Sequence, residues 1–222
     1  MLKVNCPHCG AEVVFRSAAL PVRVCDYCQT TLIRSDEGVR QVGKAATLPF
    51  DVSPIQIGTR GRFEDQAFEV IGRVRWGWTD GSWNEWLLLF ADDRHAWLGE
   101  AMGQFMLLAE RPIEDLRDEK FQSLLQGKPV DVGTEARLDD ETLIAADMRG
   151  ASCIAAEGEL PFTAVTGWSI TSVDFRSASG RCASLQRDQE GAHFYDGRYV
   201  TLAELSPTNL RPIEGWRMPA HG

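Results

Sequence analysis

Four cysteines near the start of the chain have the spacing of a metal site. They form two Cys-x-x-Cys pairs, at 6–9 ("CPHC") and 25–28 ("CDYC"), with fifteen residues between the pairs. Zinc takes four thiolates at the corners of a tetrahedron, and two such pairs separated by roughly 15–20 residues commonly supply them. The sequence therefore predicts a zinc site made of Cys6, Cys9, Cys25 and Cys28.

The predicted zinc is structural. Four protein ligands complete the tetrahedron and leave no position for water or substrate, and we expect His8, inside the first pair, to be a solvated side chain. Two disulfides or four reduced thiols are the alternatives. The N-terminus lacks the basic and then apolar pattern of an export signal, so we expect a cytoplasmic protein without disulfides.

The zinc ligands define a small N-terminal unit. Short apolar stretches between them predict strands, and Gly10 follows the first pair, where a tight turn favours positive φ. We expect a zinc ribbon over residues 1–34, which is too short to fold without its metal. A polar linker over 35–53 should separate the ribbon from the remainder, and a tail is expected over 214–222.

An internal repeat organises the remainder of the chain. The segment "PIQIGTRGRFEDQAF" at 54–68 returns as "PVDVGTEARLDDETL" at 129–143, with five identical residues and matching apolar positions. We expect the two segments to superpose. The expected matches are Gly58 with Gly133 in turns, and Ile57 with Val132 in the core.

The repeat predicts a mainly β protein with a duplicated architecture. A weaker similarity aligns 78–98 with 175–195 at a larger offset, so the second copy should contain an insertion of about 22 residues. The halves are expected at 54–110 and 128–213, packed as a closed barrel or a sandwich because pairing removes exposed strand edges. One helix is predicted to connect them, at 111–127.

Most of the acidic charge lies outside the ribbon. Residues 1–45 carry six Lys and Arg against four Asp and Glu, whereas the remainder carries 17 against 28. Such a negative surface repels phosphates, so we do not expect nucleic acid as a partner. The longest apolar stretch, "WLLLFA", is too short to span a bilayer.

Four tryptophans gather around an acidic turn. Trp76, Trp78, Trp83 and Trp86 lie within eleven residues, with Glu85 among them. One interpretation is an aromatic core. The other is an exposed aromatic and acidic surface that binds a partner protein or a small cation through cation–π contact. Strand alternation puts Trp76 and Trp78 on one face, and Trp83 and Trp86 on opposite faces.

Catalytic motifs are absent from the sequence. It contains no nucleophile elbow, phosphate-binding loop, His-Glu-x-x-His or dinucleotide motif. His95 could act with Glu85 in acid–base chemistry, although a polar residue at a strand end is the simpler interpretation. Cys153 and Cys182 are expected to be buried thiols.

Several of these segments resemble one bacterial protein family. The cysteine ribbon, "IGTRGRFEDQAFEVIGRVRW", "WNEWLLLF", "HAWL", "EGELPF" and "FYDGRYV" are similar to the family called domain of unknown function 4178. The resemblance runs from Cys6 to about Leu205 and implies no established activity. Genes for polyamine aminopropyltransferase-like enzymes and for membrane-stress proteins tend to lie near those of family members. The resemblance therefore implies a link to polyamine metabolism or to the membrane-stress response.

Two kinds of function fit these observations. The first is a non-enzymatic accessory or adaptor protein, whose zinc ribbon binds one partner protein and whose acidic aromatic part binds another protein or a small cationic ligand. The alternative is an enzyme with a site between the two halves that uses Glu85 and His95. A pocket between the halves would give such a site a place, whereas a filled interface would leave the enzyme without one.

Overall fold

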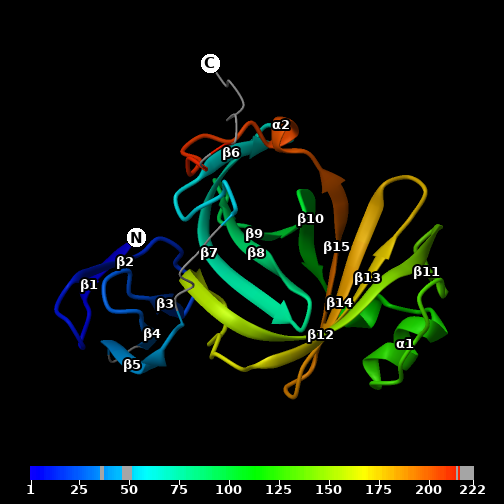
Figure 1. The fold of residues 1–222 in the computed structure, drawn as a ribbon, viewed down its shortest axis with the longest axis horizontal. Coiled ribbons are helices and arrows are strands. Elements are labelled where there is room, and N and C mark those ends of the chain that lie inside the picture. The colour runs from blue at the N-terminus through cyan, green and yellow to red at the C-terminus, as the bar shows by residue number, and fades with distance from the viewer. Residues whose placement is uncertain (36–37, 47–51, 214, 216–222) are drawn as a thin grey trace.

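The computed structural model describes residues 1–35, 38–46, 52–213 and 215 (Figure 1). The tail expected at 214–222 lies outside the described residues, apart from Gly215. The strands are β1 (Leu2–Asn5), β2 (Glu12–Phe15), β3 (Val22–Val24), β4 (Thr30–Ser35), β5 (Gly38–Lys44), β6 (Arg60–Phe63), β7 (Gln66–Trp78), β8 (Gly81–Phe90), β9 (His95–Ala101), β10 (Gln104–Arg111), β11 (Glu135–Leu138), β12 (Glu141–Leu160), β13 (Ser169–Arg176), β14 (Arg181–Arg187) and β15 (Ala192–Val200). The helices are a 3-10 turn (Ile113–Asp115), α1 (Glu119–Leu125) and α2 (Leu202–Leu205).

The mainly β prediction is confirmed, and the large sheet closes on itself as a barrel (Figure 1). Its strands follow the order β12-β13-β14-β15-β10-β9-β8-β7, and β7 then pairs with β12 to complete the ring. Neighbouring strands in this ring are antiparallel, so side chains alternate between the interior and the outer face. Among the described residues, no helix has the length and apolar character needed to cross a membrane.

Three hydrophobic clusters stabilise the barrel. One occupies its interior, around Trp76, Leu87 and Trp97. The outer face of the first half packs under β6 and α2, and that of the second half packs under β11 and α1, where Phe121 contacts Phe175. Each half thus has its own cover, and both halves share the interior.

The repeated segments have the same local structure. Gly58 and Gly133 have φ of +86° and +93°, and their N–H groups bond the carbonyls of Val70 and Ala145 at 2.8 Å. Each segment then forms a hairpin, β6 with β7 and β11 with β12. A bulge follows at the same position in β7 and β12. These shared features confirm the duplication.

Some details of the repeat were predicted wrongly. Ile57 is half-buried and packs against the outer cluster of the first half, whereas Val132 is 64% exposed and does not belong to the outer cluster of the second half. The weaker similarity is misaligned by one strand, since it equates β8 with β14, whereas strand order equates β8 with β13. The insertion is therefore shorter than expected. The extra residues lie in two places. Strand β12 has 20 residues where β7 has 13, and the connection 161–168 that follows β12 is longer than the turn that follows β7.

The connecting segment is less helical than expected over 111–127. Proline and acidic residues give a 3-10 turn at Ile113–Asp115, and α1 begins only after Asp118, whose carboxylate accepts the N–H of Lys120 at 2.8 Å. Asp118 is the N-cap of α1, which satisfies an otherwise free amide.

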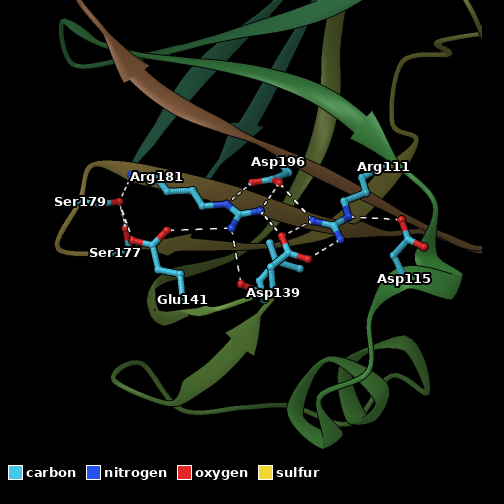
Figure 2. A network of polar contacts seen from close by, with 9 residues as sticks. Arg111, Asp115, Asp139, Glu141, Ser177, Ser179, Arg181 and Asp196 are labelled. Carbon is cyan, nitrogen blue, oxygen red and sulfur yellow. Dashed lines mark hydrogen bonds and ion pairs between the residues drawn. The ribbon is translucent and has the colours of Figure 1, made fainter.

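A charged network on the outer face joins the end of β10 to the second half (Figure 2). Arg111 donates two hydrogen bonds of 2.8 Å to Asp139, in the β11–β12 turn. Arg181 on β14 also donates to Asp139, and to Asp196 on β15, at 2.8 Å each. The guanidinium groups of Arg111 and then Arg181 hold the pKa of the Asp139 carboxyl well below its usual range.

The N-terminal ribbon is joined directly to the barrel. Strand β3 pairs with the end of β12, and β4 and β5 extend the same sheet (Figure 1). Strand β5 lies within the segment 35–53 that was expected to be a linker. Strands β3 and β12 share backbone hydrogen bonds, and the ribbon and the barrel share a hydrophobic core, so the ribbon packs directly against the barrel.

Candidate metal centre and ligand cavity

The four N-terminal cysteines form a cluster that could hold a metal ion. Their Sγ atoms lie within 4.8 Å of one another, and none of the four is in a disulfide. Cys6 Sγ lies 3.7 Å from Cys28 Sγ, and Cys9 Sγ lies 3.8 Å from Cys25 Sγ. A tetrahedron with metal–sulfur bonds of about 2.3 Å has edges of about 3.8 Å. These distances therefore fit a four-thiolate site.

Two matching turns position the thiols. Cys6 and Cys25 each begin a turn in which their carbonyl accepts the N–H of the residue four positions later, at 2.8 and 2.9 Å. Those residues, Gly10 and Gln29, have φ of +77° and +58°. Glycine takes this conformation without strain, whereas Gln29 was not recognisable from its residue type as the equivalent position. His8 is exposed, as expected.

The pKa values of the clustered thiols shift in opposite directions: that of Cys28 is lowered, and those of Cys9 and Cys25 are raised. The Thr30 hydroxyl lies 3.2 Å from Cys28 Sγ and is the main cause that lowers the pKa of this thiol to about 6. The thiolate is the form that binds metal. By contrast, burial raises the pKa of Cys153 to about 11 and that of Cys182 to about 12. These two buried cysteines are in their thiol form, and the structure places them in the barrel core.

The four clustered tryptophans divide between core and cavity. Trp76 and Trp86 are 1% and 0% exposed, whereas Trp78 and Trp83 are half-buried. Trp76, Trp78 and Trp83 point into the barrel, and Trp86 packs in the outer cluster of the first half. Trp86 donates to Glu100 at 2.9 Å, and the Arg73 guanidinium lies over its ring, 4.6 Å from the ring centroid. The tryptophans therefore do not form one continuous exposed surface.

Part of the barrel interior is a cavity of about 310 Å³ between the two halves. This volume is at the lower end of the range typical of small-molecule sites. Its aromatic walls are Trp78, Trp83, Trp97, Tyr195 and Tyr199. Glu85 from β8 and Asp174 from β13 project into it, so each half contributes one carboxyl group. We refer to this space as the acidic cavity.

Neutral donors hold Glu85 in place. It is 9% exposed and accepts hydrogen bonds from the indole N–H of Trp76 (2.8 Å) and of Trp83 (3.0 Å). Gln186 of β14 donates to it from the other half at 2.6 Å. Asp174 accepts from the hydroxyls of Ser184 (2.7 Å) and Ser172 (3.3 Å). Within the described part of the chain, neither carboxyl group forms an ion pair with Arg or Lys.

Burial raises the pKa of both carboxyl groups. For Glu85, desolvation outweighs its three hydrogen bonds, and nearby Asp174 raises the pKa further. For Asp174, desolvation outweighs the Ser184 hydrogen bond, and Asp147 adds to the increase. Two such groups without a cationic partner are costly to ionise, and a bound cation would offset that cost.

Two arginines also line the acidic cavity. Arg149 forms an ion pair of 3.1 Å with Asp147 and lies over the Trp78 ring at 5.8 Å, and Arg176 is exposed. The Glu100 carboxylate accepts from Trp86 and Asn84 on the outer face, so the carboxyl groups of the cavity are those of Glu85, Asp147 and Asp174. They outnumber its two guanidinium groups, those of Arg149 and Arg176. Its charge and aromatic walls suit an organic cation.

His95 lies elsewhere. Its Nε2 is 3.2 Å from Ser17 Oγ in the ribbon, and it does not line the acidic cavity. Desolvation lowers the pKa of His95, so the ring is neutral near pH 7. The structure therefore does not bring Glu85 and His95 together. It adds Asp174 and Gln186, which sequence reasoning missed. The one sequence signal for Asp174 was the repeat, which predicted a second set of strands equivalent to the first.

These features define a closed antiparallel β-barrel with an acidic internal cavity and a four-cysteine cluster at one side. The profile of the family described as "Domain of unknown function (DUF4178)" matches residues 56–202, and the chain belongs to this family. The match covers most of the barrel and excludes the four cysteines. No curated protein and no solved structure gave a significant match.

Proposed function

We propose that this protein is a non-enzymatic accessory protein that binds a small organic cation in the acidic cavity and carries one structural zinc ion in its ribbon. The observation that carries the proposal is the pair Glu85 and Asp174, which face one aromatic-walled cavity without a cationic partner among the described residues. Ammonium groups pair with carboxylates and with aromatic faces in such sites.

The enzymatic alternative has less support. A cavity lies between the halves and Glu85 projects into it, but His95 contacts the ribbon instead. The side chains beside Glu85 are amide and indole donors, which orient a carboxylate and do not transfer protons readily. We place the protein in the cytoplasm and expect a protein partner to receive or supply the bound cation.

The first prediction concerns the metal. Protein purified without chelator should contain about one zinc per chain, because the four sulfur positions fit tetrahedral thiolate coordination. Cys25→Ala should lose the zinc, whereas Cys153→Ala, which removes a buried thiol of the barrel core outside the cluster, should retain it. Elemental analysis measures the ratio. Equal zinc contents in the two variants would contradict the assignment.

The second prediction concerns the cation. Spermidine is the first probe, because the gene neighbourhood of the family suggests polyamines, and 1,8-octanediol is a neutral control of similar length. Calorimetry should detect spermidine binding and no diol binding. In Asp174→Asn the amide oxygen can still accept from both serine hydroxyls, but the negative charge is removed. The Kd of this variant for spermidine should therefore rise about tenfold or more. The exposed Glu190→Gln should bind normally.

The raised pKa values also predict a pH dependence. Spermidine affinity should increase as pH rises through the pKa values of Glu85 and Asp174, because the cation binds the ionised groups. Without ligand the effect on stability is opposite. Both carboxyl groups bind protons more tightly in the folded state than in the unfolded state. Their contribution to the free energy of unfolding is therefore fully present below their unfolded-state pKa values, and it is lost as pH rises through their folded-state pKa values. Asp174→Asn should flatten both profiles, which calorimetry and thermal unfolding can measure.

A further inference from the structure

We propose that the metal state of the ribbon controls the closure of the barrel, and through it the shape of the acidic cavity. This inference rests on the metal site and the cavity of the proposed function. The pairing between β7 and β12, which completes the ring, is called the seam below. Ribbon and seam meet at the end of β12.

Strand β12 belongs to both units. Its residues 152–158 pair with β7 and form the seam, and the next two residues, Glu159 and Leu160, pair with Arg23 and Val22 of β3. Strand β3 ends at Val24, directly before the cluster residue Cys25. Strand β12 therefore joins the thiol cluster, through β3, to the seam.

Glu159 makes this link costly to break. Its side chain is fully buried and accepts the backbone N–H groups of Arg16 (2.7 Å) and Ser17 (2.9 Å). The guanidinium groups of Arg23 and Arg16 lie 3.6 and 3.8 Å from its Oε1. These partners all belong to the ribbon. If the ribbon unfolds, Glu159 loses all of these partners, so the hydrogen bonds and ion pairs that hold the ribbon against the end of β12 are lost together.

Side-chain packing extends the link to the cavity. The ribbon residues Leu20, Val22 and Val24 share a core with the barrel interior. The connection after β12 carries Phe162, stacked on Trp97 at 5.9 Å, and Trp168, at 5.4 Å from Trp76. Trp97 lines the acidic cavity and Trp76 donates to Glu85. Loss of ribbon structure should therefore alter both the walls and the position of Glu85.

Coupling of this kind is reciprocal. If metal binding favours a closed seam, then any ligand that needs the closed cavity must raise the equilibrium affinity for the metal by the same factor. The ribbon would then report metal availability to the ligand site.

Hydrogen exchange of the full chain tests the inference without a cavity ligand. Zinc-loaded and chelated protein are compared by mass spectrometry. Chelation should speed exchange at least tenfold in the seam, at 72–77 and 152–158, as well as in the ribbon, while the β10–β15 pairing stays protected. A loss of exchange protection confined to residues 1–44 would overturn the inference. So would a uniform loss throughout the barrel, which would make the ribbon a general stabiliser.

A variant tests the same link with the metal in place. Glu159→Gln replaces one of its acceptor oxygens with a donor, so it should speed seam exchange and zinc transfer to a chelator, each about tenfold. Glu12→Gln, an exposed ribbon carboxylate paired with Lys3, is the matched control and should change neither. Wild-type rates in Glu159→Gln would overturn the role of Glu159. If that variant does not fold, the chelation experiment on the wild type still decides. Failure of spermidine to bind would refute the proposed ligand and leave both results unaffected.

Discussion

Replacing Trp76 or Trp86 with alanine is expected to lower the free energy of unfolding by about 3–5 kcal/mol. Both indoles are fully buried. Each also donates to a carboxyl group, Trp76 to the buried Glu85 and Trp86 to the half-buried Glu100, so alanine leaves a void and removes a hydrogen bond. Denaturant unfolding followed by circular dichroism measures the change.

Trp83→Ala is the informative comparison. Trp83 is half-buried and lines the acidic cavity, so its loss should cost about 1–2 kcal/mol of stability while weakening cation binding. Tyr27→Ala, at a residue that is 80% exposed, should have almost no effect on stability. If Trp83→Ala destabilised the fold as much as Trp86→Ala, Trp83 would be a core residue and the cavity would lose one of its proposed walls.

Gly158→Ala should destabilise the protein by about 3 kcal/mol, since it combines left-handed backbone strain with overpacking. Gly158 has φ of +72°, and a Cβ there would collide with the carbonyl oxygen of Ile71 across the seam. Gly72, its partner in the register, is equally tight against the Glu159 carbonyl. The two strands approach this closely only because both residues are glycine. Urea unfolding gives the free energy.

The same strand offers a matched control. A Cβ added at Gly150 would meet no heavy atom within 4 Å, and the backbone there does not have a positive φ. Gly150→Ala should therefore leave stability within about 0.5 kcal/mol of the wild type, or raise it slightly by restricting the unfolded chain. An equal loss in both variants would contradict a tight seam at Gly158.

The sequence alone determined the features that arise from neighbouring residues. Each Cys-x-x-Cys turn positions two thiols within four residues, so the cluster of Cys6, Cys9, Cys25 and Cys28 could be predicted from spacing. The repeat at 54–68 and 129–143 likewise encodes a turn and a hairpin of local origin. Alternation along strands correctly separated the faces of Trp83 and Trp86.

The tertiary structure decided which residues far apart in the chain come together. Gln186 reaches Glu85 across 101 positions, and Asp174 joins the same cavity, because the ring closes and turns one face of both halves inward. The strand order also showed that β8 corresponds to β13, whereas the weaker sequence similarity had aligned β8 with β14, because the extra length of β12 could not be recognised in the sequence. Glu159 resembles any surface glutamate in the sequence, yet β3 pairs beside it and buries it completely. Such placements depend on how the strands close and curve, and side-chain periodicity along a single strand contains no information about that closure.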